Sequence, residues 1–249
     1  MHQELFDDLT EIYDALIDWP KRLALETPFY RQLFEAHEAR RILDAACGTG
    51  RHAAMFHSWS LEVEATDISP AMIQRARDHF GDPDGLTWSV RGFDQKVPSA
   101  GSFGAAVCVG NSLALAPDMA TVERAIAQLL HAIRRGGAAV VHVLNLWRLE
   151  DGPCGWQKCK RAKLPQGDVL IHKGIHRCGA SGYVNLLVST LDDPPALRTE
   201  SVRFLGLEMD DLAGCAERAG TTSVQFFGGY QGQPYDRKES VDLIMVAER

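Results

Sequence analysis

Hydrophobic positions along this chain change their spacing several times, and each change predicts a different element. Between residues 3 and 19, apolar side chains recur every three or four positions, which is typical of one face of an amphipathic helix. We expect Pro20 to end this helix and a second helix to follow Pro28. From residue 41 onward, short apolar runs of strand length alternate with stretches of helical spacing.

This alternation predicts a parallel sheet with helices on both faces. The predicted strands cover residues 41–46, 61–66, 87–90, 105–109 and 138–144. One predicted helix begins near residue 51, and two more cover residues 70–80 and 119–134. Gly136 and Gly137 are interpreted as the stop of the last helix.

After Trp147 the alternation ends. Residues 150–166 are interpreted as a loop. Three β-rich stretches follow with no helix between them, at residues 169–171, 183–190 and 201–207. Strands without crossover helices indicate an antiparallel β-ribbon inserted into the α/β core.

The C-terminal part returns to the core pattern, with a helix predicted at 210–219, strands at 223–227 and 240–247, and a polar loop at 230–238. A loop this short cannot carry a parallel crossover, so the last strand should be antiparallel. We therefore expect one α/β domain with a doubly wound, seven-stranded Rossmann-like sheet in the order 3-2-1-4-5-7-6. Its parts would be a helical segment (1–40), a core (41–148), a β-rich insertion (149–208) and a return to the core (209–249).

Composition narrows the function classes. The 249 residues are 45% hydrophobic and 24% charged, which is ordinary for a globular protein. The net charge of −7 argues against a general nucleic-acid or anionic-membrane binder. The acidic N-terminus, the absence of a long apolar window and six scattered cysteines indicate a soluble, cytoplasmic protein with reduced thiols.

The strongest chemical signal is the run Asp-Ala-Ala-Cys-Gly-Thr-Gly at residues 44–50, between the first strand and its helix. Gly48 and Gly50 allow the backbone to approach a ligand closely, and Asp44 can sit beside a positive charge. Asp67 ends the second predicted strand, where a carboxylate can accept hydrogen bonds from ribose hydroxyls. These features predict a nucleoside site at the carboxyl edge of the first two strands.

Two kinds of nucleoside cofactor fit a glycine turn. Residues 48–53 satisfy a loose dinucleotide fingerprint, so an NAD(P)-dependent oxidoreductase is one alternative. Asp44 instead suits a ligand with an ammonium group. Residues 41–53 with Asp67-Ile68-Ser69 resemble the S-adenosylmethionine-binding motifs of class I methyltransferases, and the resemblance extends over most of the chain.

The resemblance implies further cofactor contacts. In that family an acid at the end of the third strand accepts a hydrogen bond from the adenine amino group; Asp94 is the candidate here, with Phe93 and Ile68 beside the ring. The run from Val107 to Leu113 is similar to the glycine N-methyltransferase branch. There, a Gly-Asn-Ser segment lines the methyl-donor pocket and its Asn contacts the substrate carboxylate.

Two flanking segments agree with this branch. Tyr13, Trp19 and Arg22 resemble the N-terminal element that folds over the cofactor, whose Arg pairs with the methionine carboxylate. Residues 142–148 resemble the His-Arg-Asn-Tyr stretch of the fifth strand. Leu144 and Leu146 stand where that branch has the Arg that binds glycine and a Tyr, so we expect a small, partly apolar acceptor rather than glycine.

These arguments predict a methyltransferase that uses S-adenosylmethionine to methylate a small molecule, with N-methylation favoured; a non-catalytic binder of S-adenosylmethionine or S-adenosylhomocysteine is the other alternative. Segment 1–40 would then be a lid, and a homo-oligomer stays open. The expected cofactor contacts are Tyr13, Trp19, Arg22, Asp44, Ala46, Gly48, Gly50, Asp67, Ile68, Phe93, Asp94 and Gly110. The expected acceptor contacts are Asn111, His142, Asn145, Trp147 and Arg148, with His142 as a base for a hydroxyl or carboxylate acceptor.

A zinc site is a rival hypothesis, because Cys154, Cys159, His172 and His176 have zinc-finger spacing. The two histidines would need a helix, but the segment around them is β-branched and contains Gly174. We therefore expect no metal and place both histidines on one face of a strand.

Overall fold

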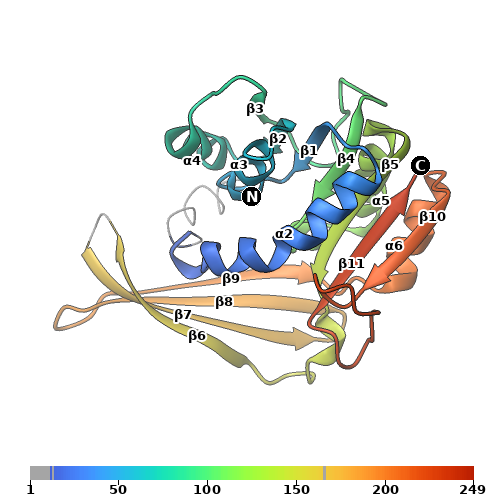
Figure 1. Ribbon diagram of the computed structural model, residues 1–249. Helices are drawn as coiled ribbons and strands as arrows, with labels where there is room; N and C mark the ends of the chain where they lie inside the picture. The colour runs from blue at the N-terminus through green and yellow to red at the C-terminus, as the bar shows by residue number, and fades with distance from the viewer. Residues whose placement is uncertain (1–11, 13, 165–166) are drawn as a thin grey trace.

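The computed structural model describes residue 12, residues 14–164 and residues 167–249 (Figure 1). Its centre is a seven-stranded sheet in the order β3-β2-β1-β4-β5-β11-β10. The strands are β1 (Arg41–Ala45), β2 (Glu62–Asp67), β3 (Leu86–Val90), β4 (Phe103–Cys108), β5 (Ile133–Leu144), β10 (Ser223–Phe227) and β11 (Asp242–Glu248). Strands β1 to β5 are parallel, and β11 is antiparallel to both neighbours. The predicted order is confirmed.

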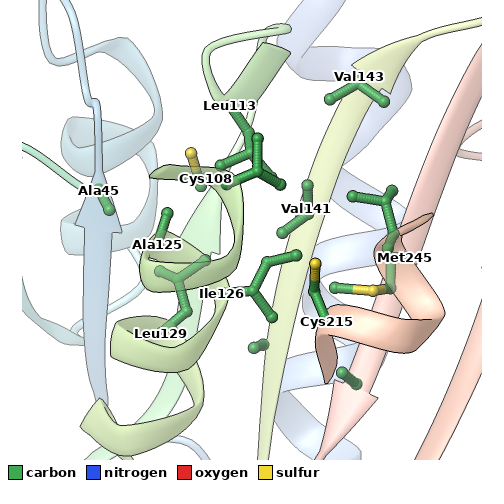
Figure 2. Close-up of a cluster of buried hydrophobic side chains, with 14 of the residues drawn as sticks. Ala45, Cys108, Leu113, Ala125, Ile126, Leu129, Val141, Val143, Cys215 and Met245 are labelled. Carbon is green, nitrogen blue, oxygen red and sulfur yellow. The ribbon is translucent and has the colours of Figure 1, made fainter. Parts of the chain in front are cut away.

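Helices cover both faces because the central strands are apolar on both sides. Figure 2 shows one face, where Ile126 and Leu129 of α5 (Met119–Ala132) and Cys215 of α6 (Met209–Arg218) pack near Val141 and Met245. The helices α2 (Trp19–Ala36), α3 (Arg51–His57) and α4 (Pro70–Phe80) cover the other face, where their buried side chains form a second core cluster. Both faces of the seven-stranded sheet are therefore covered by helices.

One sequence prediction was wrong about the N-terminal helices. We expected a helix to begin after Pro28, but α2 begins at Trp19, with Asp18 as its N-cap, and runs through Pro28 to Ala36. Proline removes one helical hydrogen bond. The helix continues because buried side chains on both sides of Pro28, Glu26 and Tyr30, are held by tertiary contacts.

Two boundaries between elements also differ from the prediction. Helix α5 ends at Ala132, and β5 begins at Ile133, before the glycine pair that was expected to stop the helix. Gly137 instead allows close strand contact, since a Cβ there would lie 2.7 Å from the Gly104 carbonyl oxygen. The predicted loop 150–166 contains the strand β6 (Gly155–Leu164). All but two residues of this edge strand are exposed, so it carries no hydrophobic alternation.

The insertion is a four-stranded antiparallel sheet in the order β6-β7-β8-β9. Its other strands are β7 (Gly167–Cys178), β8 (Ser181–Thr190) and β9 (Leu197–Leu205). One face packs on the N-terminal segment, where Ile12 and Leu16 contact a cluster that includes Val169 and Ile171. In Figure 1 this sheet lies below the seven-stranded sheet, beside the N-terminal end of α2. None of the described helices is long and apolar enough to span a membrane.

Candidate functional site

The turn between β1 and α3 has a backbone that few residues adopt. Ala46, Gly48 and Gly50 have φ angles of 62°, 55° and 80°, in the left-handed region. Gly50 also has no room for a side chain, because a Cβ would lie 2.6 Å from the Trp88 ring. The backbone of this turn is thus held in a shape that a ligand can approach closely.

Asp67, at the end of β2, fastens this turn. Its Oδ2 accepts a hydrogen bond from the Gly48 amide and its Oδ1 accepts one from the Ser69 amide, both at 2.9 Å. The side chain of Ser69 in turn caps α4. The carboxylate is 8% exposed at the carboxyl edge of the sheet, where the sequence places ribose recognition.

Asp44, at the end of β1, is the most unusual group in this region. It is fully buried, and no side chain among the described residues donates a hydrogen bond to either carboxylate oxygen; only the Ala53 amide, at the start of α3, lies close enough to lower its pKa. Burial and the nearby Asp67 carboxylate raise the pKa of Asp44 to about 7. A buried carboxylate without a charged partner is costly for the fold, so this position suits a cationic ligand that would pair with it.

The N-terminal segment closes over the glycine turn. Asp14 accepts hydrogen bonds from the Thr49 hydroxyl at 2.7 Å and from the Trp19 indole at 3.2 Å. Its other oxygen forms ion pairs with Arg51 of α3 and Arg75 of α4. The predicted contact Trp19 is therefore brought to the turn, whereas Tyr13 lies outside the described residues.

Arg22 is held in place by a buried pair that the sequence analysis missed. Its Nε donates to Glu26 Oε1 at 2.7 Å, and Glu26 Oε2 lies 2.6 Å from His52 Nε2 of α3. Despite burial, His52 and Arg22 lower the pKa of Glu26 to about 2. The spacing of Arg22 and Glu26, one helical turn apart, was a signal available in the sequence. The network fixes Arg22 beside the helix that follows the glycine turn.

The residues predicted to contact adenine lie at the ends of β2 and β3. Ile68 is 44% exposed, which is unusual for a large apolar side chain next to a buried turn. Phe93 packs partly buried against the core. One oxygen of Asp94 pairs with Arg124 at 3.2 Å. The predicted adenine contacts are therefore one exposed apolar side chain, one partly buried aromatic ring and one carboxylate that forms an ion pair.

The ends of β4 and β5 are tied to each other. Asn111, with a φ of 72°, accepts a hydrogen bond from the Leu144 amide at 2.9 Å. The Gly110 amide donates to His142 Nδ1 at 3.1 Å, and His142 Nε2 lies 3.0 Å from Asp242 Oδ1. A backbone amide therefore occupies Nδ1 of His142, and a carboxylate lies beside its Nε2.

Asn145 is fully engaged within the chain. Its Nδ2 donates to the carbonyl oxygens of Arg237 and Ser240, and its Oδ1 accepts from the Trp147 amide and the Tyr235 hydroxyl. These four bonds use the whole hydrogen-bonding capacity of an amide side chain. Asn145 therefore holds the loop before β11, and its contacts leave no group for an acceptor.

Trp147 lies beside two guanidinium groups, those of Arg177 at 5.6 Å and Arg237 at 4.6 Å from the ring centroid. Its indole nitrogen is buried without a hydrogen-bond partner among the described residues. Arg148, the next residue, is exposed.

A cavity of about 260 Å³ lies between the end of β5 and the inserted sheet. It contains the predicted residues Asn145 and Arg148, but Asn111, His142 and Trp147 do not line it. Its walls are Leu144, Asn145, Leu146, Arg148, Leu149, Gln157, Lys173, Ile175, Phe204 and Val241. The insertion thus supplies four lining residues, at positions 157, 173, 175 and 204, that the sequence analysis did not single out.

The rival zinc hypothesis finds no support in the described part of the chain. His172 and His176 lie on strand β7, four residues apart, and His176 stacks on Tyr183 at 4.9 Å. Cys159 Sγ lies 3.7 Å from His172 Nε2, but no cluster of three or more potential ligands occurs among the described residues. The two histidines belong to one face of a strand, as predicted.

Comparison with known proteins agrees with the geometry of the turn. Residues 42–137 match the family model described as a methyltransferase domain. A glycine/sarcosine N-methyltransferase of Parasynechococcus marenigrum is 31% identical over 156 residues, which cover 60% of this chain and 54% of that protein. The glycine N-methyltransferase of Oryctolagus cuniculus is 27% identical, with coverages of 66% and 63%. The chain spans little more than half the length of these relatives.

Solved structures share the fold over nearly the whole chain. The CcbJ methyltransferase of Streptomyces caelestis superposes with a TM-score of 0.78 at 18% identity and covers 96% of this chain and 95% of its own. The sugar N-methyltransferase KedS8 of Streptoalloteichus has a TM-score of 0.72 at 21% identity, with coverages of 88% and 84%. In its matched domain, its related sequences and its fold, this chain is similar to S-adenosylmethionine-dependent methyltransferases.

Proposed function

We propose that this protein transfers a methyl group from S-adenosylmethionine to a nitrogen atom of a small molecule. The observation that carries the proposal is the buried Asp44 carboxylate, which has no side-chain partner among the described residues and lies beside Ala53 in the helix that follows the glycine turn. The ammonium group of the cofactor would supply the missing positive charge. The names of the relatives, which are glycine, sarcosine and sugar N-methyltransferases, favour nitrogen as the methylated atom.

The other cofactor contacts follow from the arrangement around this group. Asp67 would accept hydrogen bonds from the ribose hydroxyls while it holds Gly48 and Ser69. Arg22 would pair with the methionine carboxylate, oriented by Glu26 and His52. The predicted contacts Trp19, Ala46, Gly48, Gly50 and Gly110 would surround the cofactor's amino-acid part, with Ile68, Phe93 and Asp94 around adenine.

Bound S-adenosylmethionine supplies an electrophilic methyl group on a positively charged sulfur. In the transfer, a nitrogen–carbon bond forms as the carbon–sulfur bond breaks, the electron pair goes to sulfur, and the methylated amine loses a proton to solvent. The protein's task is to hold both partners in line and to keep water away. We assign the described part of segment 1–40 to covering the cofactor, segment 41–148 to binding it, segment 149–208 to the acceptor side and segment 209–249 to completing the sheet.

No observation favours the two alternatives. A dinucleotide would place its pyrophosphate at the N-terminus of α3. The Asp67 carboxylate and the buried Asp44 carboxylate already lie beside the turn before this helix, and in their ionised forms they would repel phosphate. A binding protein without activity would have no need for the separate cavity beside β5.

Calorimetric titration with S-adenosylhomocysteine and, separately, with NADH tests the cofactor. We expect binding of S-adenosylhomocysteine and none of NADH. Incubation with S-adenosylmethionine and a panel of small amines then tests transfer, read as S-adenosylhomocysteine produced. Binding of NADH alone would overturn the proposed cofactor, and binding of S-adenosylhomocysteine without turnover of any amine would contradict N-methylation.

A further inference from the structure

A lysine interrupts the apolar face of the inserted sheet beside the cavity. Along β7, every second residue from Val169 to Ile175 faces inward, and Val169, Ile171 and Ile175 are no more than 5% exposed. Lys173 occupies the same face between Ile171 and Ile175 and lines the cavity. An amine in a row of buried aliphatic side chains is unfavourable for packing alone, so it calls for a partner.

The chain provides no anion for this amine. The Lys173 side chain forms no ion pair or hydrogen bond with any other described residue, and the cavity lining contains a second cation, Arg148, but no carboxylate. Its neighbour across the strand pair is Lys158. Burial, Lys158 and Arg22 lower the pKa of Lys173 to about 8, so the amine is still mostly protonated at neutral pH.

The cavity also lies beside the proposed cofactor site. The amide of Leu144, one of its walls, donates to Asn111 at the end of β4, next to Gly110. Arg22, the proposed partner of the methionine carboxylate, is close enough to Lys173 to affect its ionisation. The cavity that Lys173 lines therefore lies at the ends of β4 and β5, next to the proposed cofactor site.

We propose that Lys173 determines acceptor specificity by binding a carboxylate, and that the acceptor is a small amino acid with an apolar side chain. This inference rests on the proposed function. Lys173 is half-buried, whereas Arg148 is exposed, and the single charge of Lys173 matches that of a carboxylate. Leu144, Leu146 and Phe204 form apolar walls around it, and a cavity of about 260 Å³ suits a small ligand.

The lining offers a second group for the same carboxylate. Gln157 sits at the irregularity in the β6–β7 pairing between Trp156 and Lys158, and such bulges redirect side chains. Gln157 lines the same cavity as Lys173, and its amide is able to donate a hydrogen bond. The sequence analysis expected a carboxylate to find no charged partner here, because Leu144 and Leu146 replace polar residues. The inserted sheet supplies that charge instead of β5.

The experiment compares leucine with leucinamide, and alanine and valine with their amides, as ligands of the protein saturated with S-adenosylhomocysteine. Calorimetry should show at least tenfold tighter binding for the best free acid than for its amide. Lys173→Met should remove this preference by weakening the acid and leaving the amide unchanged. Lys163→Met, which replaces an exposed lysine of the same sheet that does not line the cavity, is the matched control.

The outcomes separate this inference from the proposed function. Binding of S-adenosylhomocysteine to Lys173→Met with wild-type affinity shows that the variant is folded. If no free acid in the panel binds better than its amide, or if Lys173→Met keeps the preference, the inference is wrong although the methyltransferase assignment stands. Failure of the wild-type protein to bind S-adenosylhomocysteine would instead overturn the proposed function.

Discussion

Two buried acids in this protein behave in opposite ways. Glu26 is 2% exposed and has Arg22 and His52 as partners, and its pKa is lowered to about 2. Asp44 is fully buried and has no side-chain partner in the described part of the chain, and its pKa is raised to about 7. The first carboxylate holds two helices together, whereas the second weakens the fold until a ligand arrives. The difference separates a structural charge from a binding site.

Among the substitutions that test this contrast, Asp44→Asn should have the largest effect. A pKa raised from 3.8 to about 7 corresponds to about 4 kcal/mol of unfavourable free energy for the ionised form. This penalty is absent near pH 4 and is complete above pH 7. Because asparagine is not ionised, the variant should be more stable than the cofactor-free wild type at pH 8 by up to about 4 kcal/mol. It should also lose more than tenfold in affinity for S-adenosylhomocysteine.

Urea unfolding at pH 5 and pH 8, together with calorimetry, measures both effects. The stability gain should grow with pH. A variant that is less stable than wild type at pH 8, or one that binds the cofactor as well as wild type, would show that Asp44 has a partner within the chain.

The opposite result is expected for Glu26→Gln. Because the folded-state pKa of Glu26 is lowered from 4.5 to about 2, its ionised form contributes about 3 kcal/mol, complete above pH 4.5 and lost as pH falls toward 2. Burial also lowers the pKa of His52, so both groups make the fold less stable in acid. The variant should be less stable than the wild type at pH 7. Between pH 4.5 and 2 its unfolding free energy should change less with pH than that of the wild type. Equal pH profiles for the two proteins would contradict this.

The effects expected of Asp67→Ala lie between those of the Asp44 and Glu26 variants, because Asp67 has both a structural role and a proposed binding role. Its carboxylate has two amide partners and, in the proposed complex, also binds ribose. The variant should lose about 1.5 to 3 kcal/mol of cofactor binding, which is more than tenfold in dissociation constant. Unlike Asp44→Asn, it should also lower the unfolding free energy. Calorimetry with an unchanged dissociation constant would contradict the ribose assignment.

Asp94→Asn should have the smallest effect. The Asp94 carboxylate is 28% exposed and pairs with Arg124, which is 55% exposed, so the ion pair contributes less than about 1 kcal/mol to stability. We expect little change in the unfolding midpoint and a weaker cofactor effect than for Asp67→Ala. Arg124→Gln is the control, since it removes the same pair without touching the proposed adenine contact. Equal loss of affinity in both variants would assign the effect to the ion pair.

Periodicity predicted those parts of the fold in which one pattern dominates. The parallel strands and α4 were found because apolar runs and helical spacing are strong there. The edge strand β6 was missed because it is exposed on both faces, and α2 was divided because tertiary contacts around Pro28 override the local preference for a break. Local pattern fails where distant residues decide the conformation.

The candidate functional site was also predicted only where the sequence signal is local. Asp44 and Asp67 follow strands and glycines in recognisable order, so local sequence indicates them. The contact between Glu26 and His52 joins residues of two helices that are 26 positions apart in the chain, a separation that no local pattern covers. Lys173 looks like an ordinary exposed residue in sequence, because the alternation on β7 does not say which face the N-terminal segment will cover.

The inserted sheet has an evolutionary consequence. It leaves the core after β5 and returns before α6, and its four strands pair only with each other among the described elements. Gln157, Lys173, Ile175 and Phe204 all come from this one excursion, whereas the cofactor turn belongs to the core. Substitutions at these four positions would therefore change the proposed acceptor contacts without changing any residue of the glycine turn. Descendants of such a protein could acquire new substrates by exchanging a single contiguous stretch of chain.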